Sequence, residues 1–302
     1  MPAEHSDGLI YRHGPDTSPT EFSPKIMQII KSTGETVEYD PTKIRGTLMR
    51  AGASSEMVER VLKRLHGQVH AGMTTKRLFT LIRRELRKEG PHLAYRYGLR
   101  TALLKLGPAG FKFERYVASI LNAYQYQATV PEKDLVGLCV NHEVDVVAVK
   151  GTQTITIEAK FRNDFGDTVK LKDVMSAWAR YIDLCEGAAS GKKCPHFDEL
   201  WIVTNGKFTD RALQFGTCKG MVLIGWSNGD SLAKMVDHAT LYPITVLDGL
   251  RQWELDRFAE RGIMLCREVA IADPKKMAGR VGLHEDRMQQ IWKQCRAVMN
   301  GD

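Results

Sequence analysis

The sequence lacks any apolar run near the ~20 residues that a helix needs to span a membrane. Its opening segment, MPAEHSDGLIYRHGPDTSPTEFSP, has no apolar stretch behind a basic start, so it does not resemble a secretory signal peptide. We interpret residues 1–23 as a flexible polar leader. We therefore expect a cytoplasmic protein with no membrane contact.

Closely spaced cysteines are also absent. The six cysteines lie far apart without a C-x-x-C pair, and nothing in the sequence favours their oxidation to disulfides. Cys185, Cys194 and His196 lie near one another in sequence, but a fourth ligand and the usual short spacing of a zinc site are missing. We expect reduced structural thiols.

Positive charge is in excess, with 43 Lys and Arg against 36 Asp and Glu, a net +7 and a pI near 9.0. Such a surplus suits a polyanionic partner, because each Lys or Arg that meets a phosphate releases condensed counterions. It would equally suit a solvated surface. Charge alone therefore selects no function.

The length of 302 residues allows two or three compact units, since domains usually contain ~100–200 residues. The patterns change at two places, which predicts a first unit over residues 24–107, a second over 109–226 and a third over 227–302. The first begins as a strand, a turn at Gly34 and a second strand. Helical periodicity follows, with a helix start at Thr74 or Thr75.

The second unit opens with a helix, FKFERYVASILNAYQY, and continues with short strands at EVDVVAVK, TITIEAKF, LWIVTN and MVLIGW. A helix, LKDVMSAWARYIDLCEG, separates the second strand from the third, and ALQFGTCKG contains another helix. This order predicts an α/β fold with a mixed sheet flanked by helices.

The segment TITIEAKF has the alternation of a strand, in which successive side chains point to opposite faces. Glu158 and Lys160 therefore share a face, ~7 Å apart along the strand. The preceding strand, EVDVVAV, is joined to it by a short turn, so the two should pair antiparallel and bring Asp145 near Glu158. A slip in register would bring Glu143 there instead, and the spacing does not separate these alternatives.

Two adjacent carboxylates repel each other and are favourable mainly when a cation lies between them. Their hard oxygen atoms suit Mg²⁺ or Mn²⁺, which can bridge a scissile phosphate and lower the pKa of a bound water. A lysine on the same face can hold the water or the phosphate. An isolated E-x-K is more often a salt-bridged surface, so the order of the elements around it is what favours phosphodiester hydrolysis.

FERYVASIL, HEVDVVA, IEAKF and LWIVTN, in this order, resemble the Mrr-type restriction endonuclease branch of the PD-(D/E)XK superfamily. The resemblance implies that Asp145 and Glu158 bind the metal, that Lys160 is the catalytic lysine, and that Glu114 in the first helix is a further acid. It also implies cleavage of DNA, expected to be double-stranded, in restriction or phage defence. His142 lies just before a strand, where a turn residue is the more common interpretation.

IIKSTGETVEYDPTKI, TTKRLF and HLAYRYGLR resemble the ATP-cone domain, an allosteric nucleotide-binding module. The resemblance implies that ATP or dATP is held by Lys31, Asp40, Lys43 and Thr75. Ser32 stands where the family usually has a second basic residue, which would weaken the contact. The sequence has no G-x-x-x-x-G-K-[ST] loop, so a bound nucleotide would regulate, by shifting an equilibrium of a homo-oligomer.

The third unit is predicted to be helical. Three short glycine-centred segments faintly resemble helix-hairpin-helix elements, which offer backbone N–H groups to DNA phosphates; simple packing of helices is the alternative. They are Leu247-Asp248-Gly249-Leu250, Glu260-Arg261-Gly262-Ile263 and Arg280-Val281-Gly282-Leu283.

The sequence thus predicts a metal-dependent DNA endonuclease with a nucleotide-binding regulatory unit. A non-catalytic, nucleotide-responsive DNA-binding regulator is the main alternative, and an RNA or repair nuclease fits the same residues.

Overall fold

The computed structural model describes residues 27–300 except 32, 108–111, 165 and 227–230. The predicted leader and Ser32 lie outside the described residues. No helix within the described part of the chain is long and apolar enough to cross a membrane. The six cysteines are free thiols.

The first unit is a hairpin followed by helices. β1 (Gln28–Ile30) pairs antiparallel with β2 (Thr36–Glu38), and Gly34 has a φ of +83° in the turn between them, which glycine adopts without strain. Thr74, rather than Thr75, caps the third helix, because its side chain accepts a hydrogen bond from the amide of Arg77. The helices are α1 (Pro41–Arg50), α2 (Ser55–His66), α3 (Thr75–Glu89) and α4 (Pro91–Leu104).

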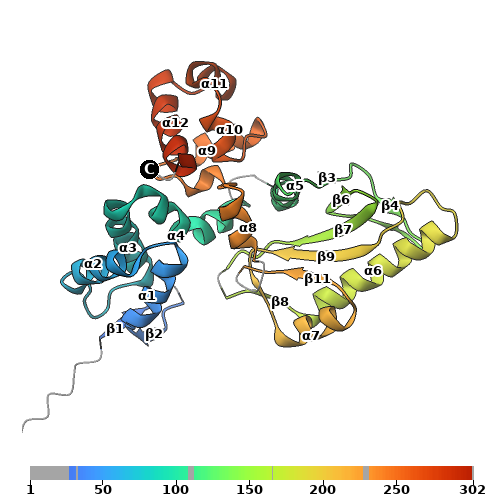
Figure 1. Cartoon of the computed structure of the whole chain (residues 1–302), viewed down its shortest axis with the longest axis horizontal. Helices are drawn as coiled ribbons and strands as arrows, with labels where there is room; N and C mark the ends of the chain where they lie inside the picture. Colours follow the sequence, from blue (N-terminus) through green and yellow to red (C-terminus); the bar gives the residue numbers. More distant parts are fainter. Residues whose placement is uncertain (1–26, 32, 108–111, 165, 227–230, 301–302) are drawn as a thin grey trace, which may run out of the picture.

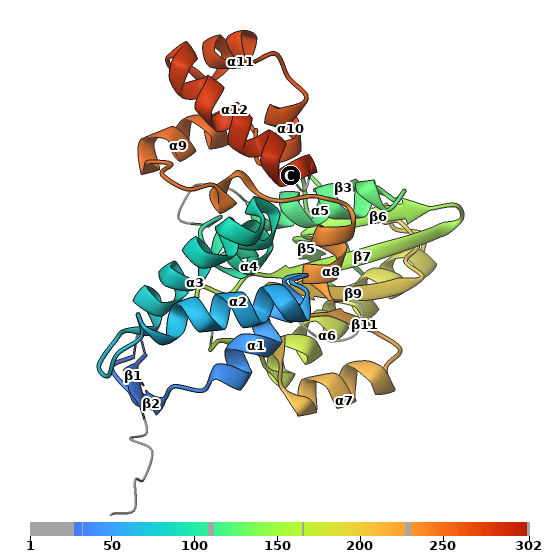
Figure 2. The same ribbon diagram turned by 60° about the vertical axis from the view of Figure 1, so that its left-hand side comes forward.

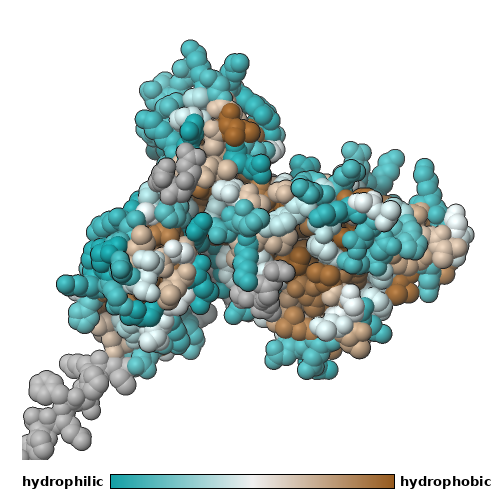
Figure 3. All heavy atoms as spheres, viewed as in Figure 1, coloured by the Kyte–Doolittle hydropathy of each residue, from teal (hydrophilic) through white to brown (hydrophobic). Residues whose placement is uncertain are grey.

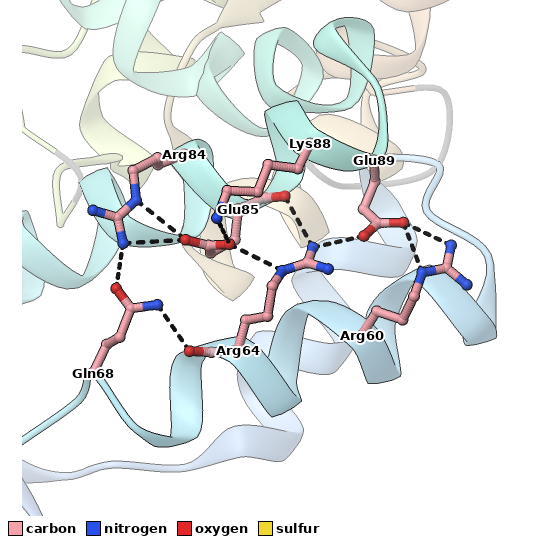
Figure 4. Close-up of polar contacts among 7 residues, drawn as sticks. All are labelled: Arg60, Arg64, Gln68, Arg84, Glu85, Lys88 and Glu89. Atoms are coloured by element: carbon pink, nitrogen blue, oxygen red, sulfur yellow. Dashed lines mark hydrogen bonds and ion pairs between the residues drawn. The ribbon is translucent and has the colours of Figure 1, made fainter.

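A network of ion pairs joins α2 to α3 (Figure 4). Arg64 of α2 donates from Nε to Glu85 Oε2 at 2.9 Å and from Nη2 to Glu89 Oε1 at 2.6 Å. Arg60 also donates to Glu89, at 2.6 Å, and Lys88 donates to Glu85 at 2.7 Å. Glu85 is fully buried, and a buried charge is tolerated only with such partners. The network therefore fixes the packing of these two helices.

The second unit is built on a mixed sheet with the strand order β11-β9-β7-β6-β3 among the described residues. β6 and β7 form an antiparallel hairpin, whereas β7, β9 and β11 run parallel. The edge strand β3 was missed on the sequence, because three residues are too few to establish an alternation. The strands are β3 (Gln127–Thr129), β6 (Val146–Lys150), β7 (Gln153–Lys160), β9 (Glu199–Thr204) and β11 (Val222–Ile224).

Helices cover both faces of this sheet (Figure 1). α5 (Phe113–Ala123) packs on the face that carries Ile155 and Ile157, while α6 (Leu171–Ala189) and α7 (Asp210–Cys218) pack on the face of Leu200 and Ile202. The predicted α/β fold with a mixed sheet between helices is confirmed. Short strand pairs flank it, formed by β4 (Leu135–Val136) with β5 (Asn141–His142) and by β8 (Thr168–Val169) with β10 (Lys207–Phe208).

The third unit is helical, and Figures 1 and 2 place its last helices at one end of the molecule, beside α4. Gly249, Gly262 and Gly282 all have positive φ, between +66° and +74°. Gly262 separates α9 from α10 and Gly282 separates α11 from α12, so the predicted glycine turns exist. Their role in DNA binding remains a prediction. The elements are α8 (Leu232–His238), the 3-10 turn η1 (Ile244–Val246), α9 (Gln252–Glu260), α10 (Cys266–Ala270), α11 (Pro274–Val281) and α12 (Glu285–Asn300).

The helix α4 belongs to two hydrophobic cores. Leu93 packs with the apolar residues of the first unit, whereas Leu99 and Leu103 pack with α5, the sheet and the last helices. The Thr245 hydroxyl donates to the carbonyl of Ala102 at 2.7 Å, which ties the third unit to the same helix. A movement of α4 would therefore change packing contacts in all three units.

The surplus of positive charge is not spread evenly. Residues 27–107 hold 16 Lys and Arg against 7 Asp and Glu, a net +9, whereas residues 108–226 hold 14 of each and residues 227–302 hold 11 of each. Hydrophilic side chains cover most of the visible surface of the first and third units, and apolar side chains gather on the second (Figure 3). The charge that suited a polyanion lies in the first unit.

Candidate active site

The register of the β6–β7 hairpin decides which acid lies beside Glu158. Val146 pairs with Ile157, so Asp145, one residue before β6, continues the register opposite Glu158. Its Oδ2 accepts a hydrogen bond from the amide of Ala159 at 2.7 Å. Glu143 is exposed two residues earlier. The structure therefore brings Asp145, and not Glu143, to the E-x-K segment.

Glu158 is only 6% exposed, and each of its oxygens has a cation. Oε1 pairs with Lys160 Nζ from the same strand, and Oε2 pairs with Arg180 Nη1 from α6. The sequence pointed to Lys160 through strand alternation. Arg180 was missed, because it lies 22 residues away on a different element and only the packing of α6 on the sheet brings it there.

Within the part of the chain that the structure describes, Asp145 forms no ion pair of this kind. Burial raises its pKa, the neighbouring charge of Glu158 raises it further, and the result is about 6, although the Ala159 amide and Lys160 pull in the opposite direction. Glu114, in the first turn of α5, also raises this pKa, so it lies near enough to act on Asp145. Asp145, Glu158 and Lys160 thus meet at the end of β7, and Glu114 acts on Asp145 through its charge.

Two side chains at the end of β9 fix the backbone beyond Lys160. The Thr204 hydroxyl donates to the carbonyl of Lys160 at 2.6 Å. Asn205 accepts from the amide of Arg162 at 2.7 Å and donates to its carbonyl at 2.8 Å. Both side chains are buried. The polar ending of the apolar segment LWIVTN was the signal that could have found them.

Comparison with known proteins also finds three parts in the chain, and its nuclease part extends to residue 236, which takes in most of α8. Family models match an ATP cone domain at residues 27–99, an Mrr-type restriction endonuclease catalytic domain at 108–236 and an AF1548-like C-terminal domain at 242–299. An uncharacterized protein of Archaeoglobus fulgidus is 30% identical over 165 residues, which cover 54% of this chain and 88% of that protein. The chain belongs to the family of this archaeal protein.

A solved structure extends the likeness. The crystal structure of a protein of unknown function, AF1548, superposes with a TM-score of 0.52 and 28% sequence identity, over 63% of this chain and 99% of that one. The chain joins an ATP cone to an Mrr-type restriction endonuclease domain, which confirms the resemblance found in the sequence motifs.

In this Mrr-type domain, Asp145 and Glu158 fit a hard divalent cation such as Mg²⁺ or Mn²⁺. Burial and the charge of Glu158 raise the pKa of Asp145, and the charge of a divalent cation would offset both effects. Mg²⁺ is commonly held by one or two carboxylates, with waters and substrate phosphates completing its shell. Over the residues that the structure describes, no group of three or more His, Cys, Asp or Glu is placed to hold a metal ion, so the protein ligands here would be these two carboxylates.

The four residues of the ATP cone that are predicted to bind the nucleotide lie in two pairs. Thr74 bridges to Ile30, which brings Thr75 at the start of α3 close to Lys31 at the end of β1. Lys31 pairs there with Glu35 at 2.9 Å. One end of the hairpin thus carries a cation beside a helix N-terminus, an arrangement that suits phosphate.

The second pair lies at the open end of the hairpin. Asp40 caps α1 by accepting from the Thr42 hydroxyl at 2.5 Å and from the Thr42 amide at 2.8 Å, and these two hydrogen bonds lower the pKa of Asp40. Lys43 lies 3.7 Å from Asp40 and is 83% exposed, so its ammonium group is accessible to a ligand. The structure separates this pair from Lys31 by the length of the hairpin.

Three further candidates from the sequence, a histidine and two cysteines, take part in packing and anchoring contacts. His142 pairs through Nε2 with Asp183 of α6 at 2.8 Å, and Asp183 also accepts from the amide of Cys139, so the contact anchors the β4–β5 hairpin to α6. Cys185 and Cys194 pack in an apolar cluster as free thiols.

Proposed function

We propose that this protein is a divalent-metal-dependent DNA endonuclease that hydrolyses phosphodiester bonds under the control of ATP or dATP. The observation that carries the proposal is the pairing of Asp145 with Glu158 across the β6–β7 hairpin, with Lys160 on the same strand. The Mrr-type domain supports nuclease chemistry, and the ATP cone supports nucleotide control.

Asp145 and Glu158 would hold the ion, and Glu114 would add a further negative group at the rim. The bound cation would polarise the phosphodiester and lower the pKa of a water molecule. Lys160 supplies a compact positive charge that orients the attacking water or the phosphate. The Ala159 amide holds Asp145 in place, and Thr204 holds the backbone of Lys160.

Double-stranded DNA is the proposed substrate, and the resemblance to Mrr-type restriction endonucleases supports a role in restriction or phage defence. The net +9 of the cone adds a sequence-independent attraction for a polyanion. A bound nucleotide would act through α4, which packs in both the cone and the nuclease core, and would shift an equilibrium between assemblies of the chain.

The test is cleavage of supercoiled plasmid with Mg²⁺, with and without ATP or dATP, by the wild type, Asp145→Ala and Lys160→Ala. We expect cutting by the wild type alone. Equal residual cutting by all three proteins would disprove the catalytic assignment. DNA binding without cleavage by the wild type would favour the alternative, a nucleotide-responsive DNA-binding regulator.

Calorimetry with ATP and dATP tests the cone separately. Lys31→Ala and Lys43→Ala should each weaken binding by about tenfold, since each removes a charge-assisted phosphate contact. Undetectable binding by the wild type would remove the nucleotide hypothesis and leave the nuclease hypothesis intact.

A further inference from the structure

Arg180 is the one member of the described site that the family motif does not include. It lies on α6 and is 29% exposed, and its Nη1 pairs with Oε2 of Glu158. Lys160 pairs with the other oxygen, Oε1. Glu158 therefore has a cation on each oxygen before any metal ion binds.

These contacts have a consequence for metal binding. A cation held between Asp145 and Glu158 needs an oxygen of Glu158, and each oxygen already faces a positive side chain. Both side chains would repel the incoming ion, so displacement of one of them would favour its binding. Arg180 comes from a neighbouring helix, so it can leave Glu158 without any change in β7, the strand that carries both Glu158 and Lys160.

The guanidinium group also suits a different partner. Its planar fork matches the oxygens of a phosphate in two parallel hydrogen bonds, and it remains charged at any working pH. A guanidinium released beside the metal-binding acids would lie where the phosphodiester must come. Its charge would then balance the negative charge that develops on the phosphate.

We propose that Arg180 has two positions: it neutralises Glu158 in the metal-free protein and contacts the scissile phosphate once the cation has taken its place. This role rests on the proposed nuclease function. Glu158 thus keeps the phosphate-binding group at the site until both metal and DNA are present.

The first test needs no cleavage and measures Mg²⁺ binding by calorimetry in the absence of DNA. Arg180→Gln removes the competitor for Glu158, so Mg²⁺ should bind several-fold more tightly than to the wild type. Arg211→Gln, which removes an exposed arginine from α7 of the same domain, is the matched control and should leave Mg²⁺ affinity unchanged. Unchanged or weaker Mg²⁺ binding by Arg180→Gln would overturn the proposal.

The second test measures the phosphate contact. At saturating Mg²⁺, Arg180→Gln should cut plasmid about 10- to 100-fold more slowly, and Arg180→Lys should recover part of the rate because it restores the charge without the fork. In EDTA, where Arg180 stays on Glu158, DNA affinity measured by fluorescence anisotropy should be the same for Arg180→Gln and the wild type. A variant that cuts at the wild-type rate would disprove the phosphate contact.

Failure of the proposed function gives a different result. If the wild type binds Mg²⁺ but cuts no DNA, the nuclease function fails, and anisotropy with Mg²⁺ then decides the role of Arg180. Weaker DNA binding by Arg180→Gln with Mg²⁺ but not in EDTA would support the two positions, and equal binding in both buffers would overturn them.

Discussion

The cone and the nuclease domain each contain a buried glutamate with several cations, yet the two clusters differ in how charge is shared. In the cone, burial alone would raise the pKa of Glu85, but bonds from Lys88 and Arg84 lower it to about 2, and Arg60 lowers that of Glu89. Every acid of this cluster has a cation.

The nuclease cluster divides its charge unevenly. Glu158 takes both Lys160 and Arg180, whereas the neighbouring Asp145 receives one amide and has a pKa raised to about 6. The two clusters are alike in the burial of their central glutamates, Glu85 and Glu158, and both glutamates have more than one ion pair. The two clusters differ in Asp145, an acid without an ion pair among the described residues, because a site that binds a cation needs negative charge that is not already neutralised.

The largest expected difference between the clusters is in cleavage. Glu158→Gln should reduce plasmid cutting by about 100-fold or more, because it removes half of the proposed metal site. Glu85→Gln should cut at close to the wild-type rate at a temperature where it is folded. Plasmid assays with circular dichroism as the folding control check this, and equal loss in both variants would contradict the division into functional and structural clusters.

In contrast to cleavage, the stability of the fold should depend on the cluster around Glu85. Glu85→Gln removes the negative charge that pairs with Arg64 and Lys88, and we expect a loss of about 2 kcal/mol in the free energy of unfolding, since the cations it leaves behind still reach water. Glu59→Gln, which breaks the exposed pair with Arg45, is the control and should change this free energy little. Urea unfolding in metal-free buffer measures both variants.

The raised pKa of Asp145 predicts a stability that depends on pH. The folded state binds the Asp145 proton more tightly than the unfolded state, in which the pKa is near 3.8. Ionisation of Asp145 therefore lowers the free energy of unfolding. This loss is absent below about pH 4 and fully present above about pH 6. Partial access to water limits this loss to about 1–2 kcal/mol.

Asp145→Asn removes this loss. In EDTA the variant should be more stable than the wild type at pH 7.5, and the difference should disappear as the pH falls to 4. A variant less stable than the wild type at pH 7.5 would show that the carboxylate supports the fold.

The smallest change in stability is expected at the junction between the third unit and the cone, where Asp248 pairs with two arginines of the cone. Asp248 accepts from Arg83 at 2.9 Å and also from Arg87, both on α3 of the cone. Asp248→Asn should lower the free energy of unfolding by less than about 1 kcal/mol, because these side chains are partly exposed. Thermal melts measure this, and a loss as large as that of Glu85→Gln would mean that the junction holds the fold together.

The sequence by itself determined the parts of this protein that depend on local periodicity and motif order. Alternation along β7 placed Glu158 and Lys160 on one face, because strand side chains repeat every second residue. The order of helix, hairpin and strands predicted the mixed sheet, and its motifs identified both domains. Glycine at positions 34, 262 and 282 marked turns that need positive φ.

Only the tertiary structure decided the rest, because contacts between distant segments depend on packing and not on spacing. The hairpin register chose Asp145 over Glu143, and the docking of α6 on the sheet brought Arg180 to Glu158. The shared core of α4, which no local pattern marks, joins the cone to the nuclease. The distribution of ion pairs in the site, which leaves Asp145 with a raised pKa, arises only when these segments pack together.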